Sequence, residues 1–461
     1  RLLSSAASDV YKRQFEDRLH ISKINNVLQA EIMPRRDGRL YLSRKRTRLI
    51  LDLRLLLRRL AYLSSITNEE RIHWHRLMIR TRILDRHLKE LFVEGVETPD
   101  GTKFGGKGFR STWQEPIAAC GTALHLGKDV AAPMIRDLGL ALSMGQTPLS
   151  IMSAQMGKSG SKMDGGHSDF GGRDLHIGDW DYGILPPTAP LPIASATATG
   201  IALASSRKGD GRFTLAPVGE GCSSSGEFWE AINFAGARGL PICYIIQNNQ
   251  IALDTFSNKQ SGAETFGDKG ASVGLPAWSI DGSDPAIYYA SVCVARELAV
   301  SGSGGCIVHV ETMRGCGHAH HHDDLYLGAE NGNPPGYVGE ELMQYWSKKE
   351  PIENHERLLR ELGVGSRLLK SIVDEEEASC AEARLTVESM KWPEPESVVI
   401  GTSKLTNART HHQQIKDLEG MKPVPSQSDI RPMKFEAASN AWTFSRACLL
   451  YTSPSPRDAE S

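Results

Sequence analysis

Strand and helix patterns alternate through the middle of this 461-residue chain, and this alternation limits the folds open to it. Residues 212–219 (RFTLAPVG) form a predicted strand, residues 225–238 (SGEFWEAINFAGAR) a helix, and residues 242–247 (ICYIIQ) the next strand. Gly239 is expected to cap the helix, since glycine readily takes the left-handed conformation that ends one, and Pro241 prevents its continuation. The segment therefore has the layout of one strand–helix–strand unit.

The same unit is repeated further along the chain. A strand is predicted at residues 277–284, a helix at 285–302 and another strand at 306–313. Such alternation is typical of a parallel sheet whose crossover helices cover it. We therefore predict an α/β fold, a parallel sheet with helices on both faces.

Composition and charge argue against several classes of partner. The net charge at pH 7 is −2, so no global field favours nucleic acid, and no apolar run reaches the roughly 20 residues that a membrane span needs. The eight cysteines contain no C-x-x-C pair and follow no secretory pattern, which favours reduced thiols in a cytosolic protein. We therefore expect a cytoplasmic protein that binds neither nucleic acid nor membrane.

The chain divides into five predicted parts. Residues 1–14 and 448–461 resemble translated adapter sequences and are set aside from the fold. Residues 15–66 form a basic N-terminal arm, residues 67–391 the α/β domain, and residues 392–447 a polar, proline-punctuated linker.

Two helical segments are expected before the first strand. Residues 35–59 are basic with interleaved leucines, which predicts a solvated helix or an arm that touches a partner subunit. A longer helix is expected to begin at Thr67 or Asn68, either of which can cap it, and to end at Gly95.

An acid held between two glycines is the first functional signal. Glu220 lies between Gly219 and Gly221, directly after a predicted strand and before a helix. Ligands of open parallel sheets bind beyond the carboxyl ends of the strands, and a helix N-terminus there favours an anion. An acid in that place is explained if a divalent cation such as Mg²⁺ bridges the carboxylate and a phosphate. Asn248 and Asn249 end the next strand and so reach the same edge, although Asn-Asn by itself is also an ordinary loop.

G-E-G, a helix and N-N at this spacing resemble the thiamine diphosphate motif. Residues 219–253 (GEGCSSSGEFWEAINFAGARGLPICYIIQNNQIAL) more closely resemble the alpha subunit of the decarboxylating component of 2-oxo acid dehydrogenase complexes, the pyruvate and branched-chain type. The similarity extends from about Glu69 to Leu362. It implies a thiamine diphosphate-binding fold with thiamine diphosphate and Mg²⁺ as cofactors.

The resemblance also implies the ligands of the metal and the diphosphate. Mg²⁺ would be held by Glu220, Asn249 and the backbone carbonyl of Ile251. The remaining turn residues expected at the cofactor are Gly219, Gly221 and Cys222, of which the last two would offer backbone N–H groups to the phosphates.

Other segments supply the rest of the implied cofactor site. Arg136, in MIRDLGLALSMGQ, matches an arginine that binds the diphosphate, while Ile135 replaces the family's tyrosine. The alternative for Arg136 is a surface ion pair with Asp137. In APLPIASATATGIALA, backbone groups of Ala189 and Leu191 would bind the pyrimidine, and the Leu191 side chain would support the bent cofactor. Taken alone, Leu191 is predicted to be a core residue.

Three histidines are the implied catalytic candidates. His167, in SKMDGGHSDFGG, matches a histidine near the substrate. In RGCGHAHHHDDLYLG, His318 matches the cofactor-facing histidine, although counting back from the two aspartates would give that place to Ala319, and His320 is the second candidate. The histidine cluster could instead be a zinc or nickel site. The family's phosphorylatable serines are absent from this loop, so regulation by a kinase is not expected there.

The implied reaction is oxidative decarboxylation of a 2-oxo acid, with acyl transfer to the lipoyl group of an acyltransferase. His318 and His167 would orient or protonate the substrate and the lipoyl sulfur. A beta subunit, or a fused beta domain beyond the linker, would supply the pyrimidine-side glutamate, so the chain is expected to be inactive alone. Two alternatives stay open: a non-catalytic scaffold or partner-binding protein on the same fold, and a transketolase-like thiamine enzyme.

Overall fold

The computed structural model describes residues 33–34, 40–41, 44–106, 108–161, 175–328 and 335–394, with side chains from Arg54 onward. These residues belong to one compact unit. The predicted terminal segments 1–14 and 448–461, most of the predicted linker 392–447, and His167 lie outside the described residues.

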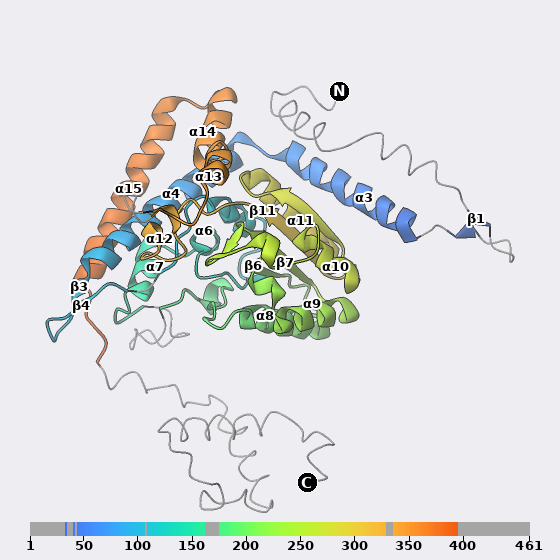
Figure 1. The fold of residues 1–461 in the computed structure, drawn as a ribbon, viewed down its shortest axis with the longest axis horizontal. Helices are drawn as coiled ribbons and strands as arrows, with labels where there is room; N and C mark the ends of the chain where they lie inside the picture. The colour runs from blue at the N-terminus through green and yellow to red at the C-terminus, as the bar shows by residue number, and fades with distance from the viewer. Residues whose placement is uncertain are drawn as a thin grey trace, which may run out of the picture. The chain divides into compact units, whose positions relative to one another are not determined.

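A five-stranded parallel sheet forms the centre of the unit (Figure 1), in the order β10-β11-β7-β6-β5. The strands are β5 (Val130–Ala131), β6 (Thr214–Gly219), β7 (Ile242–Asn248), β10 (Ala277–Asp281) and β11 (Cys306–Glu311). The four strands predicted from the sequence are all present, with ends that differ from the predicted ones by three residues or fewer. Their apolar runs are buried almost throughout, as expected of strands covered on both sides.

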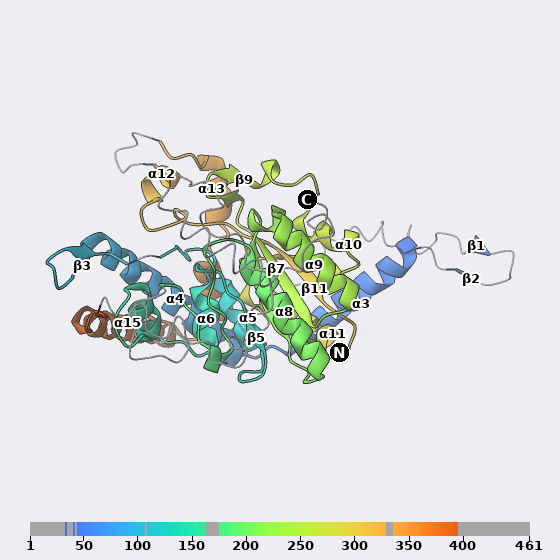
Figure 2. The ribbon, with the colours of Figure 1, turned by 90° about the horizontal axis from the view of Figure 1, so that it is seen from below.

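Helices cover both faces of the sheet. On one face, α8 (Ile193–Lys208) and α9 (Gly226–Arg238) pack on Tyr244 and Ile246 of β7. On the other face, α11 (Pro285–Val300) packs on Cys243 and Ile245, with α5 (Ala118–Thr122) and α6 (Leu138–Ser143) beyond it. The two helical layers are visible in Figures 1 and 2. The predicted α/β fold is therefore confirmed.

Helix α9 follows the predicted pattern closely. Phe228, Ile232 and Ala235, which recur at helical spacing, are all buried against the sheet. Gly239 ends the helix in the left-handed conformation, with φ 58° and ψ 43°. The helix therefore starts directly after the turn that carries Glu220.

The long helix α4 (Asn68–Glu94) also begins and ends where predicted. Thr67 and Glu70 form a reciprocal capping box at its start, and Gly95 follows its last turn. Its buried face joins the core cluster on the α11 side of the sheet. The helix lies beside α15 (Ser366–Ser389), which Figure 1 shows running along it.

The basic segment near the N-terminus is part of helix α3 (Arg44–Ser65). Leu55 is 2% exposed and belongs to the same core cluster as α4 and α11. The Arg59 guanidinium lies 5.4 Å from the ring centroid of Trp278. This helix therefore packs on its own chain through its C-terminal part, which differs from a fully solvated helix, while a contact with a partner subunit stays a prediction.

The remaining elements are short or peripheral. The other helices are α5 (Ala118–Thr122), α6 (Leu138–Ser143), α7 (Pro148–Gln155), α10 (Lys269–Ser272), α12 (Asp323–Leu327), α13 (Glu340–Ser347) and α14 (Pro351–Glu361). Three two-residue pairs complete the list: β1 (Met33–Pro34) with β2 (Leu40–Tyr41), β3 (Val96–Glu97) with β4 (Lys103–Phe104), and β8 (Ile251–Ala252) with β9 (Thr255–Phe256). Among the helices of the described ranges, none is both long and apolar enough to span a membrane.

Candidate functional site

The candidate site lies at the carboxyl ends of three neighbouring strands. β6, β7 and β11 are adjacent and parallel, so the residues that follow them meet at one edge of the sheet. Glu220 follows β6, Asn249 follows β7, and Arg314 follows β11. We call this edge, with Arg136 and Ile251 added below, the Glu220 rim.

Glu220 and Arg136 form the charged centre of the rim. Glu220 is 1% exposed, and burial raises the pKa of its carboxyl group while the neighbouring Arg136 opposes the rise. Burial lowers the pKa of Arg136, and the charge of Glu220 counteracts this. The buried acid and the guanidinium therefore influence each other electrostatically where two strands end.

Arg136 also contacts Asn249, the second predicted metal ligand. With its amide oriented to satisfy both neighbours, Asn249 accepts from Nη1 of Arg136 at 2.8 Å and donates to the carbonyl of Ile251 at 3.0 Å. In the described part of the chain, Nε and Nη2 of Arg136 have no hydrogen-bond partner. The structure thus brings together Glu220, Asn249, Ile251 and Arg136.

The alternative reading of Arg136 as a surface ion pair is wrong. The Asp137 carboxylate instead accepts from the Gln247 side chain at 3.0 Å and from the backbone N–H of Met134 at 2.9 Å. Arg136 as a whole is half-buried, but its Nε and Nη2 are buried. It lies beside Gly219, where an added Cβ would lie 3.5 Å from Nη2.

Gly221 is needed because the Ala252 side chain lies close to the turn. A Cβ on Gly221 would lie 2.5 Å from the Cβ of Ala252, on β8, so a larger residue would force the turn away. Cys222 follows, and burial raises the pKa of its thiol to about 12. The thiol is therefore protonated at neutral pH, and any role of Cys222 at the rim belongs to its backbone.

The structure separates the two histidine candidates of the 314–322 loop. His318 packs edge-on against Phe109, with ring centroids 4.9 Å apart. Burial lowers its pKa to about 3, with further contributions from Arg136 and Arg314. His318 therefore shares the electrostatic environment of the rim.

His320 lies against α4 and Gly108. Its ring lies 5.6 Å from that of Phe92 on α4, and its Nε2 would lie 2.4 Å from a Cβ added to Gly108. Burial lowers the pKa of His320 to about 4, with Asp85 opposing the shift. Its neighbours are thus residues of α4 and the 108–110 segment, and not the rim.

Two predicted cofactor residues lie away from the described contacts of the rim. Ala189 and Leu191 are exposed, and Leu191 retains 57% of its surface. The prediction that Leu191, taken alone, is a core residue is wrong. An apolar side chain left open beside α8 leaves room for another chain or a ligand to cover it.

Sequence reasoning missed two polar residues of the rim. Arg314 is 1% exposed, donates to the Leu253 carbonyl at 3.0 Å, and has Nε and Nη1 without a partner among the described residues. Its place just after a predicted strand was a usable signal, because rim residues follow strands. The side-chain amide of Gln114 lies 2.9 Å from that of Asn249, and no local pattern marks it.

The histidine loop shows no metal site of its own. Within the ranges that the structure describes, no three histidine, cysteine, aspartate or glutamate side chains are grouped to hold a metal ion. The zinc or nickel alternative therefore finds no support in the described geometry.

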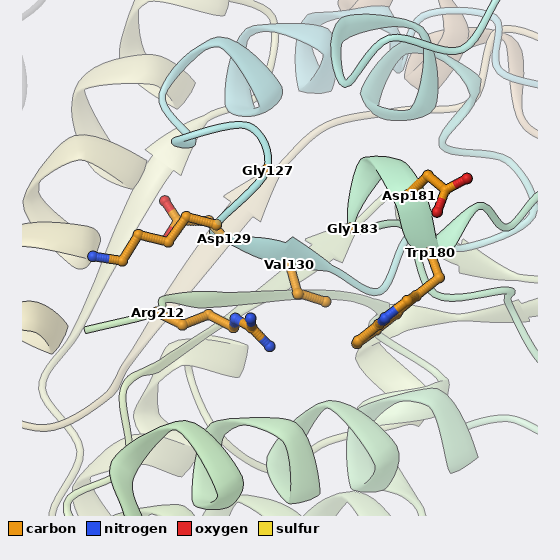
Figure 3. A pocket seen from close by; sticks show the side chains of 8 residues that line it. Gly127, Asp129, Val130, Trp180, Asp181, Gly183 and Arg212 are labelled. Atoms are coloured by element: carbon orange, nitrogen blue, oxygen red, sulfur yellow. The ribbon is translucent and has the colours of Figure 1, made fainter. Parts of the chain in front are cut away.

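A cavity of about 120 Å³ lies at the opposite edge of the sheet (Figure 3). Its lining residues are Gly127, Lys128, Asp129, Val130, Trp180, Asp181, Gly183 and Arg212. Figure 3 shows Arg212 and Trp180 extending toward the same space beside Val130, while Asp181 points away. Val130 begins β5 and Arg212 precedes β6, so this cavity lies at the amino ends of the strands. Since sheets of this kind bind ligands at the carboxyl ends, the Glu220 rim is the stronger candidate.

Comparison with known proteins identifies the family. The family described as "Dehydrogenase E1 component" matches residues 109–396, which is more than half of the chain and contains the whole rim. The chain belongs to this family. The predicted thiamine diphosphate-dependent, 2-oxo acid dehydrogenase class of enzyme is thereby confirmed.

Curated relatives are alpha subunits. The 2-oxoisovalerate dehydrogenase subunit alpha of Bacillus subtilis (strain 168) is 27% identical over 338 residues, which is 73% of this chain and 96% of that protein. The pyruvate dehydrogenase E1 component subunit alpha of the same strain is 32% identical over 202 residues, 44% of this chain and 50% of that protein. The corresponding subunit of Staphylococcus aureus (strain COL) is 34% identical over 180 residues, 39% and 46%. The match therefore spans about half the length of these two pyruvate dehydrogenase subunits.

The residues of the rim fit the family's cofactor. Arg136 and Arg314 together keep four buried guanidinium nitrogens without partners in the described ranges, which suits the oxygens of a diphosphate. Glu220, the Asn249 amide oxygen and the Ile251 carbonyl are oxygen donors, which suits Mg²⁺. Two buried guanidinium groups beside one buried carboxylate leave a net positive site for an anion.

Proposed function

We propose that this chain is the part of a 2-oxo acid dehydrogenase that binds the diphosphate of thiamine diphosphate together with Mg²⁺. The observation that carries the proposal is the hydrogen bond of Arg136 to Asn249, together with the electrostatic interaction of Arg136 with the buried Glu220, at the carboxyl ends of β6 and β7. The substrate would be a 2-oxo acid, oxidatively decarboxylated with transfer of the acyl group to a lipoyl arm.

The metal would be held by oxygen ligands of the rim. The ligands would be the Glu220 carboxylate, the Asn249 amide oxygen and the Ile251 carbonyl. Their burial supports this role, because an ion pair excluded from water is only weakly screened. Mg²⁺ takes few protein ligands and completes its shell with phosphate oxygens and water, so three are enough.

The phosphates would be held by cations and backbone amides. Arg136 and Arg314 would donate through the nitrogens that have no partner among the described residues. Gly221 and Cys222 would donate backbone N–H groups from the start of the short 3-10 turn, Cys222–Ser224, that precedes α9.

When bound, thiamine diphosphate supplies the thiazolium carbon and the electron sink for loss of carbon dioxide. His318 would act beside it as a neutral imidazole, since its pKa of about 3 leaves it unprotonated at neutral pH. A neutral ring can donate a hydrogen bond from one nitrogen and accept a proton at the other. His318 would therefore orient the 2-oxo acid or move its protons, with His167 as a second proposed contact and His320 as the less favoured one.

The partners would be a beta subunit, or a fused beta domain, and a lipoyl-bearing acyltransferase. The relatives' names as alpha subunits support a second subunit. Leu191 and Ala189 are exposed, which supports a shared site in which a partner covers the pyrimidine side. That partner would supply the glutamate which activates the aminopyrimidine.

The two alternatives are less well supported. Burying a carboxylate beside two guanidinium groups with unpaired nitrogens costs free energy. A scaffold that binds no ligand gains nothing to offset this cost. A transketolase-like activity is not suggested by a family described as dehydrogenase E1 components.

The test is cofactor binding to an Arg136→Ala variant, with the chain co-expressed with a beta subunit. Calorimetric titration with Mg²⁺ and thiamine diphosphate should show affinity weakened by about 10- to 150-fold, the equivalent of a charge-assisted hydrogen bond of ~1.5–3 kcal/mol. The matched control is Arg212→Ala, which removes an arginine at the opposite edge of the sheet and should leave affinity unchanged. Equal affinities for wild type and Arg136→Ala would overturn the assignment.

A further inference from the structure

A buried lysine contacts the turn that follows Glu220. Lys269, the first residue of α10, is 4% exposed. Its Nζ donates to the carbonyl of Ser223 at 2.6 Å, to the Ser223 hydroxyl at 2.9 Å and to the Ser224 hydroxyl at 3.4 Å. One ammonium group therefore uses its donors on two successive residues of the turn.

These contacts continue to the predicted metal ligand. The Ser223 hydroxyl donates to the backbone carbonyl of Glu220 at 2.6 Å. The Ser224 hydroxyl donates to the carbonyl of Gln260 at 3.1 Å, which ties the turn to a second segment. A continuous chain of hydrogen bonds thus runs from Lys269 through Ser223 to the backbone of Glu220, and a change at Lys269 alters the support of the turn.

The surroundings of Lys269 are apolar on two sides. Its Nζ lies 5.3 Å from the ring centroid of Trp229 and 5.1 Å from that of Phe266. Among the described residues, its hydrogen bonds go to Ser223 and Ser224 and to no carboxylate. Burial lowers its pKa to about 8, so the group is still mostly charged at pH 7. A buried cation without an acid partner is costly unless an anion comes close.

We propose that Lys269 is a positioning residue for the diphosphate site, which holds the Glu220–Ser225 turn in shape and places a positive charge behind it. The proposal rests on the proposed function, because it takes this turn as the site of the diphosphate. It adds a cation on α10 to the two guanidinium groups at the rim. Its role is exerted through Ser223 and Ser224, and not through direct contact with the reacting atoms.

The experiment compares Lys269→Met with Lys158→Met in the full chain co-expressed with a beta subunit. Lys158 is a matched control, since it is also buried, donates to one backbone carbonyl (Met390, 3.1 Å) and lies 3.7 Å from the Trp392 ring centroid. Amide hydrogen exchange of residues 220–225 without cofactor is the first measurement. Lys269→Met should raise exchange in this turn by about 10-fold or more, the equivalent of one lost charge-assisted hydrogen bond, whereas Lys158→Met should not.

Binding of Mg²⁺ and thiamine diphosphate is the second measurement. Lys269→Met should weaken binding by about 10-fold or more, and Lys269→Arg should retain part of the affinity because the charge is kept. Unchanged exchange in the turn, or faster exchange with unchanged affinity, would overturn the proposal. If wild type binds no thiamine diphosphate, the proposed function fails, whereas the exchange data still report whether Lys269 holds the turn.

A Ser223→Ala variant keeps the test decisive if Lys269→Met does not fold. It removes the hydroxyl that joins Lys269 to the Glu220 carbonyl and leaves the charge in place. The variant should raise exchange in the turn and weaken cofactor binding in the same direction. Wild-type behaviour in both measurements would contradict the proposed chain of support.

Discussion

His355 shows how a single buried imidazole links stability to pH. It lies 3% exposed where α14 meets α4, with Nε2 2.9 Å from the carbonyl of Arg71. Burial lowers its pKa to about 3, from an ordinary value of 6.5, although the hydrogen bond to Arg71 opposes the shift. Between these two pKa values the unfolded chain binds more protons than the folded one. Stability should therefore be full above pH 6.5 and fall as the pH drops toward 3.

Replacing His355 with glutamine should flatten this dependence. The amide can still donate to the Arg71 carbonyl but does not titrate. Between pH 6 and 4, the slope of the unfolding free energy with pH should decrease by up to about 1.4 kcal/mol per pH unit, the contribution of one proton. Urea unfolding at several pH values measures this slope, and His125→Gln, at an exposed position, is the control. An unchanged slope in His355→Gln would show that His355 is not held neutral by the fold.

At the scale of elements, α15 is fixed to α4 by a row of arginine–carboxylate pairs. Glu376 is buried between Arg76 (2.8 Å) and Arg80 (3.0 Å). Burial opposes its ionisation, but the hydrogen bonds from Arg80 and Arg76 outweigh this and hold its pKa below the usual range. Its neighbour Glu377 pairs with Arg86 at the surface, where its side chain is 40% exposed. The two glutamates therefore differ in burial while sharing one helix.

Glu376→Ala should destabilise the chain more than Glu377→Ala. Loss of the buried carboxylate leaves Arg80 without this partner and Arg76 with only the exposed Glu375, which costs about 1.5–3 kcal/mol. The exposed pair should contribute less than about 1 kcal/mol. The difference can be measured from the midpoints of thermal or urea unfolding, with salt expected to reduce the smaller effect further. Equal losses in the two variants would mean that burial does not decide the strength of these pairs.

The elements around the sheet were predictable because their signals are local. The strand ending at Gly219, helix α9 and the strand ending at Asn248 each have an apolar period and a terminating residue within their own sequence. Helix α15, by contrast, lies against α4 through contacts between residues about three hundred positions apart, and no local pattern encodes such a pairing. The packing of Leu55 was missed for the same reason.

The candidate site divides in the same way. Glu220 and Asn249 were predictable from strand direction alone, because the carboxyl ends of parallel strands meet at one edge. Arg136 came only from the family resemblance, since it lies on a loop with no periodic signal. Neither route separated His318 from His320, because the conformation of that loop depends on contacts with Phe109 and Phe92.

At the scale of the whole molecule, several large apolar side chains are exposed on α8 and α9, the two helices that cover one face of the sheet. Leu191 is 57% exposed and Ile193 45%, and both lie at or just before the start of α8. Phe234 is 39% and Trp229 38% exposed on α9. Large apolar side chains gathered on neighbouring helices are typical of a surface that a partner covers. Under the proposed function, the rim would supply the diphosphate end of the site, and the cover over Leu191 would come from the beta part.

The chain alone should bind thiamine diphosphate poorly and should decarboxylate no 2-oxo acid. Its described residues include arginine side chains for the proposed diphosphate contacts and oxygen ligands for the proposed Mg²⁺ site. The proposed pyrimidine contacts at Ala189 and Leu191, in contrast, are open to water. Water at an open site weakens every electrostatic interaction there, and the activating glutamate would be absent. The assay follows reduction of an artificial electron acceptor with pyruvate and with branched 2-oxo acids, first with the chain alone and then with a beta subunit in trans. Turnover should appear only with the beta subunit, and the preferred acid would then define the substrate. Sustained turnover by the chain alone would show that the second half of the active site lies within this chain.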